Sequence, residues 1–362
     1  MDEVLKNMNG KPVEELPTPS IVADINELKS NLSKMDSYFN NKSSKLRPHF
    51  KSHKCVTLAK LQMEYPNTIG ITCAKLSEAE QLVKGGVEDV LVANQVIGID
   101  KCRRIALMNK NAIVGVAIDS YEGIEQLSYA ADEIGVEISV LVEVDIGMNR
   151  GGVKPGQQVL ELVEMISEKG GLRFDGLQSY EGHIVTLPNY DERKQRVEED
   201  MKPLLETRKL LEQKGYSVFI SSGGTGTYDI TGNIEGIDEL QCGSYALMDT
   251  AYKTIRPEFL NSRYILATVI SKRGDVIATD VGLKGMGAEF SKPIIVGYLE
   301  AENHYIAEEH TVFENIDVNI GDKIKIIPPH GCTTNNFYSH MWISKNNIIE
   351  DVWPIEGRGC LE

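Results

Sequence analysis

A lysine that lies among other basic and imidazole groups is the strongest candidate for chemistry in this sequence. Lys51 falls in the run Arg47-Pro48-His49-Phe50-Lys51-Ser52-His53-Lys54, which holds three Lys or Arg side chains and two imidazoles within eight residues. Neighbouring positive charge lowers the pKa of a lysine amine, and the neutral amine is a nucleophile. The run therefore predicts a nucleophilic Lys51, although a solvated surface lysine would give the same residue type.

Two glycine-rich segments could hold a phosphate group. Gly223-Gly224-Thr225-Gly226-Thr227 and Gly243-Ser244-Tyr245 each follow a short apolar run. Glycines let the backbone approach an anion closely, and successive N–H groups then form a cradle around it. A flexible turn is the alternative interpretation of either segment alone.

Two further segments place polar side chains after apolar runs, namely Gly147–Gly152 and Tyr180–His183. Arg150 could bond a phenolate oxygen, Tyr180 could lie against a flat ring, and His183 could exchange protons with a substrate. Each residue also has an ordinary interpretation, as a loop arginine, a packing tyrosine or a surface histidine.

His330-Gly331-Cys332 puts two soft metal ligands two residues apart. In an extended segment, residues i and i+2 point to the same side, so that both could bind one ion. Imidazole with thiolate suits Zn²⁺, and two protein ligands would leave coordination positions open for a substrate. His340 and the run Glu308–His310 could add ligands, but an isolated His-x-Cys also occurs often by chance.

The elements that must position these residues alternate regularly. Short apolar runs alternate with segments of helical spacing, and Ser77, three residues before Glu80, fits a capping box at one helix start. The apolar runs are 46–50, 69–74, 89–93, 112–118, 137–144, 176–180, 217–221 and 239–243. Eight such runs favour an α/β fold with a closed (β/α)8 TIM-type barrel over residues 25–255, with an open doubly wound sheet as the alternative. In such a barrel, residues after the strands face the active site.

From residue 256 to 362 the pattern changes to β-rich runs separated by turn residues. This pattern predicts a separate C-terminal domain of mostly antiparallel β strands. The N-terminal segment 1–24 is expected to pack on this domain, because Pro17–Ala23 is typical of an extended segment.

Composition limits the classes of partner. The net charge of −15 argues against a nucleic-acid partner, which would require clustered Lys and Arg. The N-terminus lacks the pattern of a signal peptide, and no apolar stretch is long enough for a membrane span. The six scattered cysteines are typical of a reduced, cytoplasmic enzyme.

Together these motifs resemble the D-threonine aldolase and D-serine dehydratase family, which are fold-type-III pyridoxal 5'-phosphate (PLP) enzymes related to alanine racemase. The similarity extends from about residue 17 to the end of the chain, and the motifs keep the order that they have in the family. The matching stretches are 47–54, 144–150, 176–183, 223–227, 243–249, 280–284 and 329–332.

The resemblance implies that Lys51 carries PLP as a Schiff base and that the enzyme is a homodimer acting on small D-amino acids. It implies Arg150 near the phenolic oxygen of the cofactor and Tyr180 beside its ring. The residues expected around the phosphate are Gly224, Thr225, Gly243, Ser244 and Tyr245. His330 and Cys332 become the expected ligands of a divalent metal, Zn or Mn, which would hold the β-hydroxyl of the substrate.

The same resemblance leaves the reaction open. Aldolase members often carry Asp at the second metal position, so Cys332 points toward zinc and dehydration, whereas Tyr180–His183 is more similar to aldolase members. We favour retro-aldol cleavage of a D-threonine-like substrate, with Lys51 and His183 as the catalytic residues. A D-serine or D-threonine dehydratase is the alternative, followed by a racemase or a non-catalytic PLP-binding protein.

Overall fold

The computed structural model describes residues 7–298 and 300–362, and the chain divides into two compact units. The barrel unit comprises residues 36–51, 59–243 and 360–362; the β unit comprises the segment that ends at Met35 together with residues 52–58 and 244–359. The limits predicted from the sequence, 25–255 and 256–362, remain a prediction.

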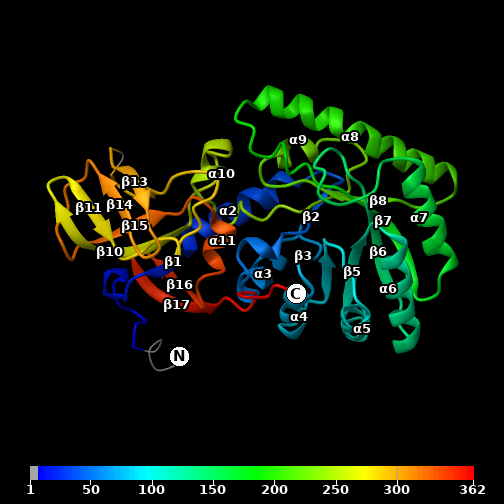
Figure 1. Cartoon of the computed structure of the whole chain (residues 1–362), viewed down its shortest axis with the longest axis horizontal. Helices are drawn as coiled ribbons and strands as arrows, with labels where there is room; N and C mark the ends of the chain where they lie inside the picture. The colour runs from blue at the N-terminus through cyan, green and yellow to red at the C-terminus, as the bar shows by residue number, and fades with distance from the viewer. Residues whose placement is uncertain (1–6, 299) are drawn as a thin grey trace. The chain divides into compact units, whose positions relative to one another are not determined.

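The barrel unit is built on an eight-stranded sheet in which all neighbouring strands are parallel (Figure 1). In spatial order the strands are β2 (Lys45–Leu46), β9 (Glu239–Leu240), β8 (Phe219–Ser222), β7 (Leu172–Gln178), β6 (Ile138–Glu143), β5 (Ile113–Ile118), β4 (Asp89–Val92) and β3 (Ile71–Cys73). Two bridges, Leu46–Thr68 and His49–Thr72, each join one outer strand, β2 or β3, to a residue that flanks the other, so the sheet closes on itself. The (β/α)8 barrel predicted from the sequence is confirmed.

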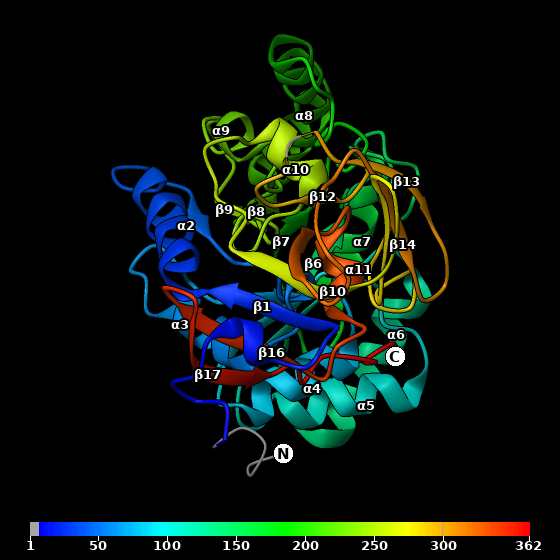
Figure 2. The ribbon, with the colours of Figure 1, turned by 90° about the vertical axis from the view of Figure 1, so that its left-hand side faces the viewer.

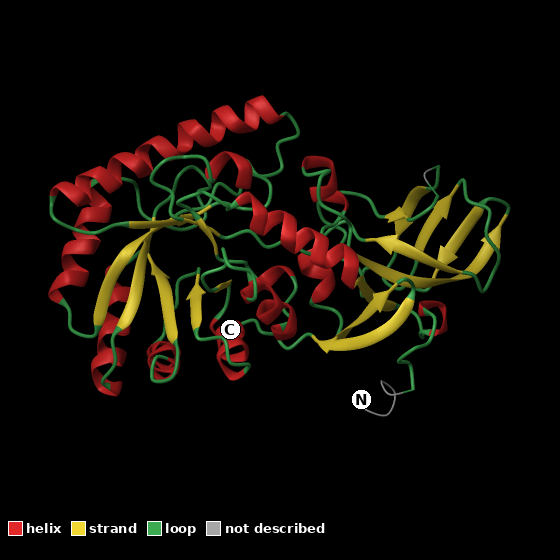
Figure 3. Cartoon of the chain, turned by 180° about the vertical axis from the view of Figure 1, so that it is seen from behind, coloured by secondary structure: helices red, strands yellow, loops and turns green. Residues whose placement is uncertain are grey.

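The strands and helices of this unit form for reasons that are visible in the sequence. β6 is buried along its whole length, as expected of a strand that is covered on both faces. Helices lie on the outer side of the strands (Figure 3). They are α4 (Leu76–Lys84), α5 (Ile99–Met108), α6 (Tyr121–Ile134), α7 (Gln157–Glu168), α8 (Tyr190–Gln213) and the short α9 (Tyr228–Thr231). Helix α6 shows both end signals, because Ser120 caps its N-terminus and Gly135 ends it with a φ of 75°.

One predicted helix start is wrong. Helix α4 begins at Leu76, and its N-cap residue Lys75 makes no side-chain cap. Ser77 lies in the first helical turn, where its backbone N–H and its hydroxyl both donate to the carbonyl of Glu362, each at 3.1 Å. A tertiary contact with the chain end therefore replaces the predicted capping box.

The β unit holds a nine-stranded sheet. Its strands are β1 (Ser20–Asp24), β10 (Arg263–Arg273), β11 (Val276–Thr279), β12 (Ile294–Ile295), β13 (Glu302–Ile306), β14 (Thr311–Glu314), β15 (Lys323–Ile327), β16 (His340–Lys345) and β17 (Ile348–Pro354). All pairs are antiparallel except β1 with β16, which confirms the mostly antiparallel sheet. β1 lies between β10 and β16 (Figure 2), so a strand from the N-terminal segment pairs with strands near the end of the chain.

Short helices complete the β unit, and two longer helices connect the units. Within the β unit these are η1 (Val13–Glu15), α10 (Thr250–Ile255) and α11 (Gly331–Asn335). Helices α2 (Ile25–Tyr38) and α3 (Val56–Met63), like the 3-10 turn η2 (Phe50–Ser52), have residues in both units. Among the described residues, no helix combines the length and the apolar character that crossing a membrane requires.

Candidate active site

Three of the predicted residues lie together in the barrel unit, two of them over the aromatic ring of the third. The Lys51 Nζ lies 5.6 Å from the centroid of the Tyr180 ring, and the Arg150 Cζ lies 5.8 Å from it. Lys51 follows β2, Arg150 follows β6, and Tyr180 follows β7. All three thus lie beyond the C-terminal ends of barrel strands, which is where this fold carries its active sites.

The loop that carries Arg150 has a tightly defined backbone. The carboxylate of Asp145 accepts hydrogen bonds from the backbone N–H groups of Gly147 and Asn149, both at 3.0 Å. Gly152 has a φ of 92°, and a Cβ placed there would lie 2.8 Å from the backbone nitrogen of Asp145. Only glycine therefore suits this position, and the loop presents Arg150 from a fixed base.

The carboxylate of Glu143, which the sequence reasoning missed, contacts the Arg150 guanidinium. Its carboxylate lies 3.7 Å from the Arg150 guanidinium and accepts a hydrogen bond of 2.5 Å from the Gln95 amide. Glu143 is only 5% exposed, and burial raises its pKa, with a smaller contribution in the same direction from the charge of Asp119. A signal existed in the sequence, because Glu143 follows the mostly apolar segment Ile138–Val142, and charged residues are seldom fully buried unless they are paired.

The loop Gly223–Thr227 comes close to the same aromatic ring. A Cβ on Gly224 would lie 3.2 Å from the Tyr180 ring, and Gly223 has a φ of 78°. A Cβ on Gly226 would lie only 1.9 Å from the carbonyl oxygen of Val185. Only glycine fits at these positions, because a side chain would collide with the neighbouring backbone or ring. Thr225, between Gly224 and Gly226, is buried, with 2% of its surface exposed.

A buried carboxylate, that of Glu181, is hydrogen-bonded to this loop. Glu181 is fully buried and accepts hydrogen bonds of 2.6 Å from the hydroxyls of both Thr227 and Thr231, and a longer one of 3.4 Å from Ser222. Sequence reasoning missed this role, because Glu181 stands between two candidate site residues and no local pattern shows that it points inward.

His183 pairs with an acidic residue of the long helix α8. Its Nε2 lies 2.8 Å from the carboxylate of Asp200. Its Nδ1 is shielded from solvent and has no hydrogen-bond partner among residues 7–298 and 300–362. If Nε2 carries the proton that Asp200 accepts, Nδ1 is the nitrogen with a free lone pair.

The second glycine segment crosses the boundary between the units. Gly243 is the last residue of the long barrel-unit segment 59–243. The carbonyl of the preceding Cys242 accepts a hydrogen bond of 3.0 Å from the His49 N–H. Ser244 and Tyr245 belong to the β unit. There Tyr245 is 1% exposed, and its ring centroid lies 6.0 Å from that of Phe259.

His330 and Cys332 lie next to each other in the β unit, but not in the extended conformation that we expected. His330 is the N-cap residue of α11, and Cys332 already lies in the first turn of that helix. The imidazole and the thiol nevertheless lie close enough to interact electrostatically. Burial lowers the pKa of His330, while Cys332 and neighbouring carboxylates raise it by more, so that it ends above its ordinary value.

The residues that could have added metal ligands, His340 and Glu308–His310, do not join this pair in a larger cluster within the described part of the chain. Glu308 and Glu309 form ion pairs with Lys284, and the His340 imidazole contacts Ser339 and the Trp342 ring. In the described part of the chain, no group of three or more His, Cys, Asp or Glu residues is placed to hold a metal ion. An imidazole and a thiol side by side are still a donor set that fits a soft divalent ion with open coordination positions.

Two buried charges fix the segment that carries this pair. The Asp249 carboxylate accepts a hydrogen bond of 2.8 Å from the N–H of Gly331, and the Arg263 guanidinium donates to the carbonyl of Gly331 at 3.0 Å. A Cβ on Gly331 would lie 2.5 Å from the Arg263 guanidinium. Burial raises the pKa of Asp249 and lowers that of Arg263.

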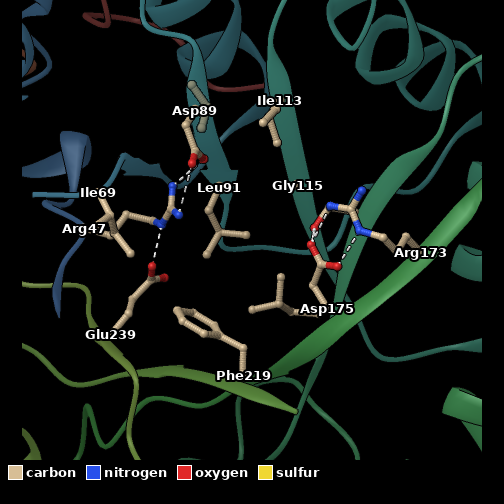
Figure 4. A pocket seen from close by; sticks show the side chains of 13 residues that line it. Arg47, Ile69, Asp89, Leu91, Ile113, Gly115, Arg173, Asp175, Phe219 and Glu239 are labelled. Atoms are coloured by element: carbon tan, nitrogen blue, oxygen red, sulfur yellow. Dashed lines mark hydrogen bonds and ion pairs between the residues drawn. The ribbon is translucent and has the colours of Figure 1, made fainter. Parts of the chain in front are cut away.

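Arg47 does not contribute to the environment of Lys51 as the sequence predicted. Its guanidinium bridges the carboxylates of Asp89, at 2.6 Å, and Glu239, at 2.7 Å. This ion cluster lines a cavity of about 350 Å³ at the N-terminal ends of the barrel strands, together with the ion pair of Arg173 and Asp175 (Figure 4). The arginines there are ion-paired, and this end of a (β/α)8 barrel usually serves stability.

The residues present fit a ring-bearing phosphate cofactor such as PLP. The Lys51 amine and the Arg150 guanidinium lie over the Tyr180 ring. The loop Gly223–Thr227 passes close to the same ring, and its glycines avoid the clashes that a Cβ would create. Each group has a counterpart in what such a cofactor requires, namely an amine for its aldehyde, a cation for its phenolic oxygen and backbone N–H groups for its phosphate.

Comparisons with known proteins agree with this geometry. Residues 23–251 match the family model "Alanine racemase, N-terminal domain", and residues 262–344 match the "Putative serine dehydratase domain". A 3-hydroxy-D-aspartate aldolase of Paracoccus denitrificans (strain Pd 1222) is 33% identical, covering 97% of this chain and 94% of that protein. A D-threonine aldolase of an Arthrobacter species is 32% identical, covering 97% and 95%.

A solved structure is similar over the same length. The crystal structure of D-threonine aldolase from Filomicrobium marinum superposes with a TM-score of 0.95 at 32% identity, covering 98% of this chain and 99% of that chain. The chain therefore belongs to the D-threonine aldolase and D-serine dehydratase family, whose members are PLP-dependent lyases of the alanine racemase fold.

Proposed function

We propose that this protein cleaves D-3-hydroxy amino acids of the D-threonine type to glycine and an aldehyde, with PLP and a divalent metal ion. The observation that carries the proposal is the arrangement of the Lys51 amine and the Arg150 guanidinium over the Tyr180 ring, with Gly224 against the same ring. The names of the two aldolase relatives support the choice of reaction.

The proposal assigns a role to each predicted residue. Lys51 would carry PLP on its amine, Arg150 would bind its phenolic oxygen, and Tyr180 would contact its ring. Gly224, Thr225, Gly243, Ser244 and Tyr245 would hold its phosphate. His330 and Cys332 would hold the metal ion, Zn or Mn.

When bound, PLP supplies an electron sink for the charge that develops at the substrate Cα, and the metal supplies a Lewis acid for the β-hydroxyl. His183 is the proposed base for the hydroxyl proton, and it would take that proton at Nδ1, because Nε2 is paired with Asp200. Since Nδ1 is shielded from solvent, substrate binding must open a path to it. Glu143 contacts the guanidinium of Arg150 and would keep it in place during turnover.

Dehydration of D-serine or D-threonine is the second candidate, and Cys332 favours it. The thiol beside His330 suits zinc, and the C-terminal family model is described as a serine dehydratase domain. In that reaction Lys51 would remove the Cα proton, and the β-hydroxyl would leave. We further propose that the enzyme is a cytoplasmic homodimer.

Product analysis tests the proposal. Purified protein would be incubated with D-threonine or D-serine, PLP, and Zn²⁺ or Mn²⁺. Glycine with acetaldehyde would support the aldolase, whereas 2-oxobutanoate or pyruvate with ammonia would establish the dehydratase. Absence of all these products would refute both.

The Lys51→Ala variant is the control for the cofactor. It should lose the visible absorbance that PLP has when bound to a lysine amine, and it should lose activity. Lys75→Ala, an exposed lysine of the same unit, should keep both. Retention of the absorbance in Lys51→Ala would show that another amine carries the cofactor.

A further inference from the structure

Two side chains contact the ring nitrogen Nδ1 of His330. The Thr333 hydroxyl oxygen lies 2.9 Å from Nδ1, and a carboxylate oxygen of Glu289 lies 3.3 Å from it. The Thr333 hydroxyl also donates to the second carboxylate oxygen of Glu289, at 3.0 Å. The three side chains therefore form a closed set of contacts in the β unit.

The hydrogens of this set can be assigned. An ionised carboxylate only accepts hydrogen bonds, and a hydroxyl has one proton to donate. Because the Thr333 proton is directed to Glu289, both the Thr333 oxygen and the Glu289 carboxylate require a proton on Nδ1 of His330. The neutral imidazole then has its free lone pair on Nε2.

The backbone keeps Glu289 in this position. Gly287 forms an antiparallel bridge with His330, and its N–H donates to the Thr334 hydroxyl at 3.1 Å. A Cβ on Gly287 would lie 2.9 Å from the Glu289 carboxylate, so a larger residue would disturb the contact. The segment before Glu289 is therefore tied directly to the segment that begins at His330.

The residue after Glu289 has an unusual backbone. Phe290 has a φ of 75°, which a bulky residue seldom adopts, and 78% of it is exposed. Its ring lies edge-on to the His330 imidazole, with the centroids 4.9 Å apart. Such strain persists where the surrounding structure imposes it and is concentrated at functional sites. Here it places a carboxylate on one side of His330 and an aromatic ring on another.

We propose that Glu289 and Thr333 are positioning residues that fix the Nδ1–H tautomer of His330 and thereby present Nε2, beside the Cys332 thiol, to a divalent ion. Metal-binding histidines almost always donate their other N–H to a carboxylate or a carbonyl, and loss of such a partner typically weakens metal binding about 10- to 100-fold. This inference rests on the proposed metal site. It adds Glu289 and Thr333, which contact the His330 ring, to the determinants of that site.

Metal affinity of the PLP-loaded protein tests the inference without any measurement of turnover. Zn²⁺ binding would be measured by calorimetry, and Co²⁺ binding by its absorption spectrum, in Glu289→Ala and Thr333→Val. We expect Glu289→Ala to bind about 10- to 100-fold more weakly than the parent protein. Glu289→Gln should recover part of the loss, because its amide oxygen can still accept from Nδ1. Glu309→Ala is the matched control and should bind Zn²⁺ as the parent does, because this exposed carboxylate forms an ion pair with Lys284.

A second readout reports the tautomer directly. The ¹⁵N chemical shifts of the His330 ring in the metal-free protein should show a protonated Nδ1 in the parent and a mixture of tautomers in Glu289→Ala. Parent-like affinity and parent-like shifts in Glu289→Ala, with His330→Ala failing to bind, would overturn the inference and leave the metal site intact. Parent-like Zn²⁺ affinity in His330→Ala would overturn the metal site itself. If Glu289→Ala does not fold, Glu289→Gln and Thr333→Val carry the same comparison.

Discussion

Replacing Glu181 by alanine should destabilise the barrel unit and loosen the loop Gly223–Thr227. The carboxylate is fully buried and accepts two hydrogen bonds of 2.6 Å, from Thr227 and Thr231. A hydrogen bond to a charged group contributes about 1.5–3 kcal/mol, so the loss of two predicts about 3–5 kcal/mol. Thr227 can turn to the carbonyl of Gly224 at 3.4 Å, which keeps the loss below the sum of two full bonds.

Glutamine at the same position separates hydrogen bonding from charge. Both threonine hydroxyls donate to Oε1 of Glu181, and the glutamine amide oxygen in that place can still accept from both. The amide N–H then faces the Ser222 hydroxyl, so Glu181→Gln should cost about 1 kcal/mol. Thr231→Val should be less costly in the Glu181→Ala background than in the parent, because the partner is already absent. The double-mutant cycle formed by Glu181→Ala and Thr231→Val is expected to give a coupling free energy of about 1–2 kcal/mol.

The assay must report on the barrel unit. Both tryptophans, Trp342 and Trp353, belong to the β unit, so urea unfolding should be followed by far-ultraviolet circular dichroism rather than by intrinsic fluorescence. Faster hydrogen exchange in residues 223–231 would show the local loosening. Titration with PLP would show whether the loosened loop weakens cofactor binding. Glu164→Ala, an exposed residue of α7, is the control and should stay within about 0.5 kcal/mol of the parent. A Glu181→Ala protein as stable as this control, with unchanged exchange, would refute the reasoning.

Three further predictions concern other buried groups. Burial raises the folded-state pKa of Glu143, so that between its unfolded and folded pKa values the folded protein binds more protons than the unfolded chain. Stability should therefore fall as the pH rises through that window. Glu143→Gln should flatten this part of the curve of unfolding midpoint against pH, and an unchanged curve would contradict the assignment. Gly226→Ala places a Cβ 1.9 Å from a carbonyl oxygen and should weaken PLP binding about 10-fold or more, whereas Gly115→Ala, with contacts of 3.4 Å or longer, should bind PLP normally in the same titration. Arg263→Met leaves buried carbonyl groups without their donor and should cost about 3 kcal/mol or more in thermal unfolding. Arg103→Met, at a partly exposed helix position, should cost less than about 1 kcal/mol, and equal losses would count against a structural role of the buried guanidinium.

Local patterns in the sequence were sufficient for the architecture and for the order of the chemical groups. Eight apolar runs with helical segments between them predict a parallel barrel, because strands of this kind must be covered on both faces. The side chains that follow those runs, such as Lys51, Arg150 and Tyr180, are then expected at one end of the barrel. The sequence positions alone contain this information, since parallel strands all end on the same side.

The partners of each group were decided only by the tertiary structure. Arg47 looked like a neighbour of Lys51 in sequence, yet it pairs with Asp89 and Glu239, which are distant in the chain. The roles of Glu143 and Glu181 depend on hydroxyl, amide and guanidinium groups that other strands and loops bring to them. Even the conformation of Cys332, which is helical and not extended, depends on the contacts of Gly331 with buried charges. Hydrogen bonds and ion pairs between distant segments have no periodicity along the chain, so only the folded backbone can show which groups meet.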